Sequence, residues 1–221
     1  MQCGIFGKLP AKRDFISYNI PRPFLNAWES WLQAAVAESR HAMGDRWTGI
    51  FLTQPIQHFW CGPGVFGQAV AGAIMPSVDG VGRYFPLSIC AVETGDGWPA
   101  PPDFGVLDNW FAACDTALLG QLEDGAEFEA SRILDRVGLP PAIVPTPSHQ
   151  GEDPVHIWSE GSGTLQPAFA ALYASDCVRL NSQRGIWWTS GSKTQPAQLI
   201  TTQGLPQPSL WITFMTGLIA T

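Results

Sequence analysis

Hydrophobic residues recur at helical spacing in several parts of this 221-residue chain. The clearest case follows Pro21 and Pro23, where apolar side chains fall on one face of a helix. They are Phe24, Trp28, Trp31, Leu32, Ala35 and Val36. The spacing predicts a helix from about Pro23 to Met43, and Gly44 is a suitable residue for its C-terminal end.

The same spacing predicts shorter helices in other parts of the chain. Their ranges are 46–53, 106–122, 128–137, 165–173 and 211–218. Short apolar runs bounded by turn residues predict about six strands. Their ranges are 2–7, 56–61, 69–75, 84–92, 186–189 and 198–202. We expect loops in the ranges 8–19, 62–64 and 140–154.

The three central predicted strands follow one another without helices between them. Parallel neighbours would need crossovers of a dozen or more residues, so this order favours antiparallel pairing. We therefore expect a single α+β domain over residues 1–221, with an antiparallel-rich sheet of about six strands flanked by helices. The Pro- and Gly-rich connection at 95–102 is the best internal boundary, but it is too short to indicate separate domains.

The segment from Ile74 to Val92 joins two apolar runs through a polar loop. Asp79-Gly80 is a turn dipeptide, because Gly adopts positive φ freely and Asp can bond its own backbone. The pattern predicts a hairpin in which Asp79 and Arg83 face each other. One interpretation is a partly buried ion pair that fixes the loop. The other is a recognition site, because Arg presents a rigid fork of donors to carboxylate or phosphate.

Other residues are candidates for binding or for fixing the loop. Lys8 and Asp14 allow the same two interpretations, and Ser77 lies in the same loop as Asp79. Trp187 and Trp188 lie in a predicted strand, so one indole is expected on each face of the sheet. An exposed indole there would be a candidate for an interface.

Composition narrows the class of protein. Hydrophobic residues make up 45% of the chain and charged residues 14%, which favours a compact fold over disorder. The net charge of −7 gives no general attraction to nucleic acid. Ten tryptophans are more than a core of this size needs, so a surplus would suit an interface.

Cysteine usage and the absence of targeting patterns suggest a location. The five cysteines are scattered, odd in number and without a C-x-x-C pair, which predicts free thiols in a reducing cytoplasm. The first residues lack the basic start and apolar region of a signal peptide. Since no run of about 18 apolar residues occurs, we expect no membrane insertion.

Motifs for catalysis, nucleotides and metals do not have the required spacing. GIFGK at 4–8 has too few residues between its glycines for a phosphate-binding loop. Gly161-Ser162-Gly163 lacks the spacing of a nucleophile elbow. His58 and Cys61 are close in the chain but would point to opposite faces of a strand. We therefore expect no metal, no cofactor and no catalytic residue.

Three ordered blocks resemble the TagF family, also called ImpM. The blocks are GIFGKLP at 4–10 with Asp14-Phe15, MPSVDGVGRYFPL at 75–87, and WWTSGS at 187–192 with GLP at 204–206. The resemblance extends over nearly the whole chain. One departure is Arg13, which stands where the family pattern has Gly before Asp14-Phe15.

The resemblance implies a cytoplasmic accessory protein of the bacterial type VI secretion system. It further implies a post-translational repressor of apparatus assembly that binds a forkhead-associated scaffold protein and is not an enzyme. Two alternatives stay open: an enzyme or small-ligand-binding protein with a polar site around Lys8, Asp14, Asp79 and Arg83, and a structural subunit of the secretion machine. The partner surface and the oligomeric state also stay open.

Overall fold

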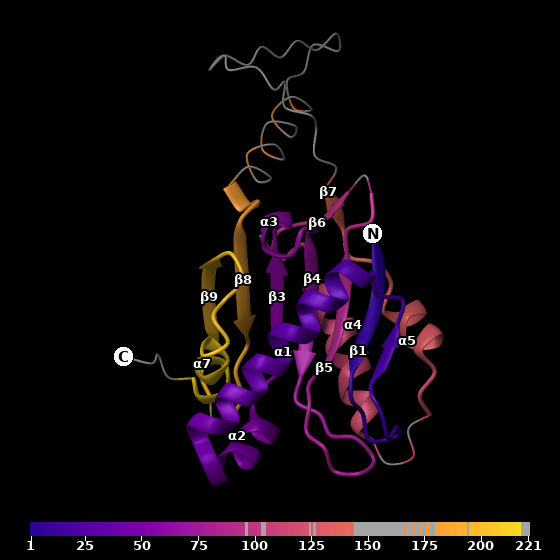
Figure 1. Cartoon of the computed structure of the whole chain (residues 1–221). Coiled ribbons are helices and arrows are strands. Elements are labelled where there is room, and N and C mark those ends of the chain that lie inside the picture. Colours follow the sequence, from indigo (N-terminus) through magenta and orange to yellow (C-terminus); the bar gives the residue numbers. More distant parts are fainter. Residues whose placement is uncertain are drawn as a thin grey trace.

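Seven strands form one antiparallel sheet in the order β2-β1-β5-β4-β3-β8-β9 (Figure 1). The computed structural model describes residues 1–95, 97–102, 105–123, 125, 127–143, 166, 169, 173, 176, 180–193 and 195–217. The strands are β1 (Gln2–Gly7), β2 (Ile16–Tyr18), β3 (Gln57–Cys61), β4 (Val70–Met75), β5 (Leu87–Val92), β8 (Arg184–Thr189) and β9 (Gln198–Gln203). A separate pair joins β6 (Trp98–Pro99) to β7 (Ala142–Ile143). The predicted α+β class and the adjacent antiparallel order of β3, β4 and β5 are confirmed.

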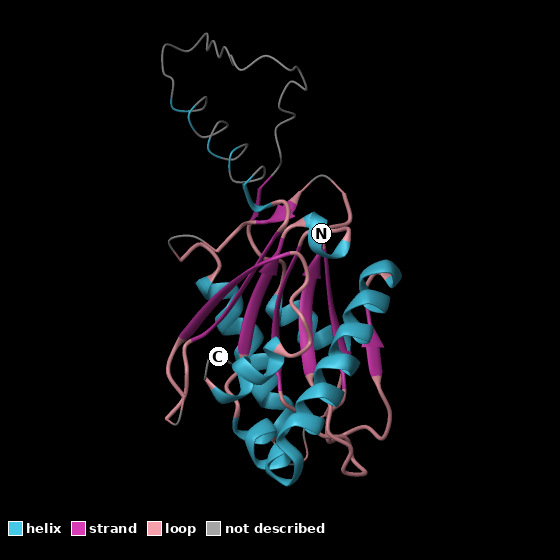
Figure 2. Ribbon diagram, turned by 60° about the vertical axis from the view of Figure 1, so that its left-hand side comes forward, coloured by secondary structure: helices cyan, strands magenta, loops and turns pink. Residues whose placement is uncertain are grey.

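Helices cover both faces of the sheet (Figure 2). One face carries α1 (Arg22–Met43), α2 (Trp47–Thr53), α3 (Pro63–Phe66) and α7 (Leu210–Thr216), with the 3₁₀ turn η1 (Gly44–Arg46) between the first two. The other carries α4 (Asp108–Leu119) and α5 (Ala130–Val137), with the 3₁₀ turn η2 (Gly120–Leu122) after α4. We name these two sides the α1 face and the α4 face. Among the described residues, no helix is long and apolar enough to cross a membrane.

Alternation along the strands divides the apolar residues between two cores. In β3, Phe59 packs on the α1 face and the next residue, Trp60, on the α4 face. In β4, Ile74 belongs to the α1 face and Ala73 to the α4 face. Because successive side chains of a strand point to opposite sides, uninterrupted apolar strands are expected when both faces of a sheet are covered.

Stacked aromatic rings dominate the core on the α1 face. The ring of Trp28 lies 4.7 Å from that of Phe59, and Phe59 lies 5.1 Å from Trp187. Gly72 of the neighbouring strand leaves room for this stack, since a Cβ there would come within 2.5 Å of the Phe59 ring. Trp28 Nε1 also donates a hydrogen bond to Ser88 Oγ at 3.0 Å. We call Trp28, Phe59 and Trp187 the aromatic stack.

The described tryptophans are structural. All of them are buried except Trp188, which is partly buried against the ring of Phe111 on the α4 face at 4.8 Å. The expected division of Trp187 and Trp188 between the two faces is confirmed. The suggestion that surplus tryptophans serve an interface finds no exposed indole in the part of the chain that the structure describes.

Several element boundaries differ from the prediction. Strand β5 begins at Leu87 rather than Tyr84, because Pro86 has no N–H for the ladder. The segment expected to be a loop at 8–19 contains the edge strand β2, and that at 62–64 begins the short helix α3, with Pro63 in its first turn. The predicted loop at 140–154 includes β7 and then lies outside the described residues, as does most of the predicted helix at 165–173.

The described cysteines are free and buried. Cys3, Cys61, Cys90 and Cys114 form no disulfide, and Cys177 lies outside the described residues. Burial raises the pKa of all four thiols, to about 12 for Cys3. These side chains are therefore neutral, unreactive thiols in the folded protein.

Candidate functional site

A buried carboxylate organises the loop between β4 and β5. Asp79 Oδ1 accepts hydrogen bonds from the backbone N–H groups of Val81, at 3.1 Å, and Arg83, at 2.9 Å. Its Oδ2 accepts from Lys8 Nζ at 3.0 Å and from Arg83 Nε at 2.7 Å. The side chain of Asp79 is fully buried, so every contact that neutralises it comes from within the protein. The predicted approach of Asp79 and Arg83 across this loop is present.

The loop after β1 docks onto the loop before β5. Gly80 N–H donates to the carbonyl of Lys12 at 2.8 Å, and a Cβ on Gly80 would come within 2.9 Å of the Pro10 carbonyl. The Arg83 guanidinium reaches the same segment, where its Nη2 donates to the Arg13 carbonyl and to Asp14 Oδ1. The two loops therefore form one unit, although they are about 70 positions apart in the chain.

The charges within this unit stabilise one another. Burial alone would raise the pKa of Asp79, but hydrogen bonds from Arg83, Lys8 and Val81 outweigh it and hold this pKa well below the usual 3.8. The hydrogen bond to Asp79 raises the pKa of Arg83 in turn. We call Lys8, Asp79 and Arg83 the polar cluster.

Aromatic rings close the cluster on the side of α1. Phe15 lies 5.8 Å from the ring of Phe6 and 4.8 Å from that of Phe85. Lys8 Nζ lies 4.8 Å from the centre of the Phe15 ring, which suits a cation–π contact. Phe15 was not among the residues that the sequence singled out as functional, yet it forms part of the cover of the buried ammonium group.

The other predicted candidates lie in different environments. Ser77 is buried beside the loop, and its carbonyl accepts from Phe85 N–H at 3.1 Å. Its Oγ is buried and has no hydrogen-bond partner among the described residues. Trp187 and Trp188 lie on β8 and are not part of the polar cluster. Arg13 does not have positive φ, so the fold does not require a glycine at this position. Among the described residues, the non-glycine residue with positive φ is Asn19.

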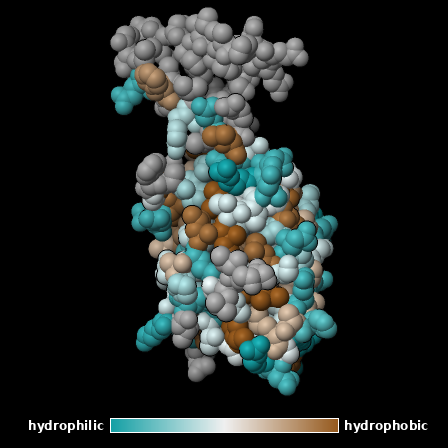
Figure 3. Space-filling model, turned by 90° about the vertical axis from the view of Figure 1, so that its left-hand side faces the viewer, coloured by the Kyte–Doolittle hydropathy of each residue, from teal (hydrophilic) through white to brown (hydrophobic). Residues whose placement is uncertain are grey.

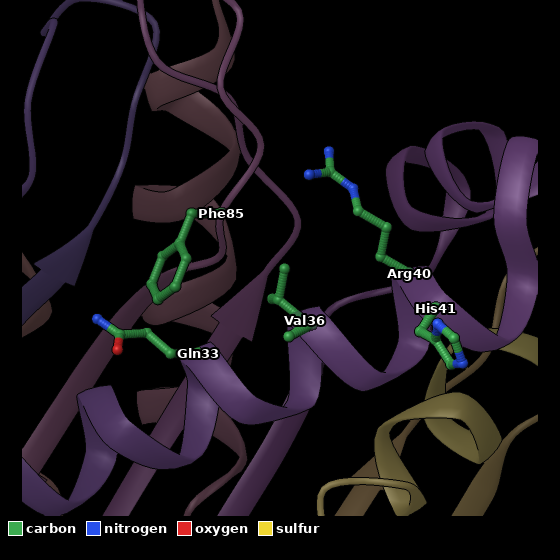
Figure 4. Close-up of a pocket in the computed structure, with 6 residues that line it drawn as sticks. Gln33, Val36, Arg40, His41 and Phe85 are labelled. Atoms are coloured by element: carbon green, nitrogen blue, oxygen red, sulfur yellow. The ribbon is translucent and has the colours of Figure 1, made fainter.

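An open cavity of about 490 Å³ lies between α1 and the loop that joins β4 to β5 (Figure 4). Its lining consists of Gln33, Val36, Ala37, Arg40, His41 and Phe85. Phe85 points from the loop toward Gln33, while Arg40 and His41 lie further along α1. The guanidinium of Arg40 lies 4.6 Å from the centre of the Trp47 ring. The cavity thus combines apolar walls with basic side chains and contains no acidic one.

A histidine–carboxylate pair lies on the α4 face, away from the loops. His58 Nε2 lies 2.8 Å from Asp115 Oδ1, and the imidazole packs 4.5 Å from the ring of Phe111. No group of three or more metal-binding side chains occurs among the described residues, so this pair has no further ligands there. We therefore interpret this pair as a structural contact that joins β3 to α4.

Comparison with known proteins identifies the class to which this fold and this pair of loops belong. A model of the TagF N-terminal domain, described as type VI secretion system-associated, matches residues 4–136, a range that includes the whole polar cluster. The chain therefore belongs to the TagF family and is a type VI secretion-associated protein.

A solved structure extends the likeness to the whole chain. The crystal structure of PA0076 from Pseudomonas aeruginosa PAO1 is similar with a TM-score of 0.79 and 30% sequence identity. The match covers 99% of this chain and 96% of that one. Among curated proteins, no sequence matched the chain.

Proposed function

We propose that this protein is a non-enzymatic, cytoplasmic negative regulator of the type VI secretion system. It binds a forkhead-associated scaffold protein and thereby restrains assembly of the apparatus after synthesis of the components. Membership of the TagF family supports the connection to this secretion system. The repression, the scaffold partner and the contact surface go beyond family membership and are the content of the proposal.

One structural observation carries the proposal. The polar cluster holds the two docked loops in one conformation, and apolar side chains are exposed at their surface. Val81 is 56% exposed and Phe15 is 43% exposed, beside the half-exposed side chain of Arg83. A rigid loop with exposed apolar groups is suited to protein recognition, because little conformational entropy is lost on binding. We call Asp14, Phe15, Val81 and Arg83 the loop surface.

The cavity beside α1 extends this surface. Phe85 lines the cavity and also contacts the ring of Phe15 at 4.8 Å, so the cavity and the loop surface adjoin. Arg40 and His41 add basic character to one end. A partner segment that carries apolar side chains and a carboxylate would complement both parts.

Co-purification with the scaffold protein tests the proposal. Val81→Asn should weaken the complex by about tenfold or more, the effect of losing about 1.4 kcal/mol of contact free energy. Leu139→Asn is the matched control, because Leu139 is 55% exposed in the loop after α5 and should leave binding unchanged. Equal binding of both variants would exclude the loop surface, and absence of any complex with wild-type protein would exclude the scaffold as partner.

Repression is tested separately in cells. Deleting the protein should increase secretion, and Val81→Asn should reproduce part of that increase while Leu139→Asn should not. If the deletion reduces secretion instead, the protein is a structural subunit and not a repressor.

An enzyme or small-ligand-binding protein is the second candidate, because the structure brings Lys8, Asp14, Asp79 and Arg83 together. Lys8 and Asp79 are buried and paired, so a ligand from solvent would meet Arg83 and Asp14 first. Calorimetry with phosphate and with dicarboxylates, on wild type and Arg83→Ala, separates this function from protein binding. Saturable binding that requires Arg83 would favour it.

A further inference from the structure

The two edges of the sheet differ in how they are protected. Edge strands commonly carry charges or prolines, or are short, which prevents pairing with another chain. Strand β2 at one edge has three residues and follows the charged segment from Lys12 to Asp14. Strand β9 at the other edge has six residues, QLITTQ, without a charge or a proline. It also contains Leu199, which is 70% exposed.

The hydrogen-bonding pattern shows which backbone groups of β9 are directed outward. Gly204 N–H donates to the Gln183 carbonyl at 2.7 Å, in register with the β8–β9 ladder. Because bonded positions alternate along an antiparallel pair, Ile200 and Thr202 also direct their backbone groups toward β8. The N–H and C=O groups of Leu199, Thr201 and Gln203 therefore point away from β8, to the side on which no other described strand pairs with β9. The same three side chains are exposed.

We propose that β9 pairs antiparallel with β9 of a second copy of the chain, which joins the two sheets into one. Directly opposite residues lie on the same face of a sheet, so residues of equal parity must face each other. The register that uses all three outward-directed residues places Thr201 opposite Thr201 of the second copy. It also places Leu199 opposite Gln203 of the second copy. The twofold axis then passes midway between the two Thr201 residues.

Charge does not oppose direct pairing of two copies of β9 at this edge. The paired segments are uncharged, so the symmetric contact brings no like charges directly together. The net charge of −7 on each chain acts over a longer distance and opposes association. Salt screens such repulsion, so the dimer should strengthen as ionic strength rises. An interface held by attraction between charges would weaken instead.

The proposed interface is separate from the loop surface. Figure 3 views the molecule from the side of β9 and shows hydrophobic side chains gathered there among polar ones. The loop surface lies at the β1–β2 and β4–β5 connections, toward the opposite edge of the sheet. A variant that disrupts the dimer should therefore still bind the scaffold, and the two proposals can fail independently.

Sedimentation equilibrium of the full chain tests the pairing. Strand pairing buries less surface than the 1,200–2,000 Å² of a typical stable interface, so the dimer should form at roughly micromolar or higher concentrations. The average mass should rise from 24.0 kDa toward twice that value with concentration. Thr201→Pro removes one outward N–H and leaves the β8 ladder intact, so it should keep the protein monomeric and folded. Leu199→Lys should act likewise, whereas Ala112→Lys adds the same charge at an exposed position of α4 and should still dimerise.

A symmetric disulfide tests the register. Opposite residues at a bonded position have Cα atoms about 5.5 Å apart, which a disulfide can span. In a Cys177→Ser background, Thr201→Cys should give a covalent dimer on mild oxidation, while Thr202→Cys should not. The other four cysteines are buried and do not compete. A wild-type protein that stays monomeric at every concentration and salt, or a dimer that Thr201→Pro leaves unchanged, overturns the proposal.

Discussion

The aromatic stack and the polar cluster attach the N-terminal part of the chain to the central strands in different ways. The stack joins α1 to β3 and β8 through large apolar rings whose contacts are numerous and only weakly directional. The cluster joins the end of β1 to the loop before β5 through one carboxylate that accepts four hydrogen bonds. The stack should therefore determine global stability, while the cluster determines the conformation of one surface.

Trp28→Ala should have the largest effect on stability. It removes a fully buried ring from the aromatic stack and leaves a cavity, so we expect a loss of about 3–5 kcal/mol in the free energy of unfolding. Urea denaturation measures this loss. The control is Leu52→Ala, at an exposed position of α2, which should change stability by less than about 0.5 kcal/mol. A similar loss for both variants would mean that the stack has no special weight.

Lys8→Met should have a smaller effect. It replaces a buried ammonium group with an apolar side chain of similar length, and Asp79 keeps its three other hydrogen bonds. We expect a loss of about 1–3 kcal/mol, because one buried charged partner is removed. A loss as large as that of Trp28→Ala would show that the cluster, not the stack, dominates the stability of the fold.

Acid should weaken the cluster in a predictable direction. The pKa of Asp79 is lower in the folded protein than its usual value of 3.8. As the pH falls to about 3.8, the carboxylate is therefore protonated in the unfolded chain before it is protonated in the folded protein, so unfolding takes up a proton. The contribution of Asp79 is complete above about pH 5 and is lost as the pH falls toward 2. Melting temperatures of wild type and Asp79→Asn should therefore converge between these values.

Asp14→Asn is the control for this pH experiment. It removes a carboxylate that is 93% exposed in the same pair of loops, and so separates the loss of one negative charge from the loss of the buried hydrogen bonds. Curves for wild type and Asp79→Asn that stay parallel down to pH 2 would contradict the assigned role of the carboxylate.

The sequence predicted features that depend on local pattern and missed those that depend on distant contacts. The spacing of Phe24, Trp28 and Trp31 predicted α1 to within one residue, because helical periodicity is a local property. Strand β2 was missed because three residues are too few to show an alternating pattern. Its pairing with β1 defines it instead.

The candidate site was predicted in part for the same reason. Asp79 and Arg83 are four positions apart, so a turn was enough to predict that they meet. The contact between Lys8 and Asp79 spans 71 positions, and spacing along the chain cannot reveal it. The cover provided by Phe15 and Phe85 has the same origin, since their contact depends on how the two loops dock.

Arg83→Ala should have the smallest effect on stability and the most informative effect on function. The side chain is 55% exposed, and both hydrogen bonds to Asp79 Oδ1 come from backbone N–H groups that the substitution keeps. The guanidinium, however, links Asp79 to the carbonyl of Arg13 and so holds the two loops together. We therefore expect a small decrease in melting temperature, faster amide exchange in the loop and weaker binding of the scaffold.

Arg83→Lys separates the two roles of this side chain. Lysine keeps the charge but lacks the forked donors that reach Asp79 and the Arg13 carbonyl together. If Arg83 positions the loops, the lysine variant should exchange and bind as the alanine variant does, because both lose the link. If Arg83 contacts the partner through charge, lysine should restore binding without restoring slow exchange. Unchanged melting, exchange and binding in both variants would show that the polar cluster does not organise this surface.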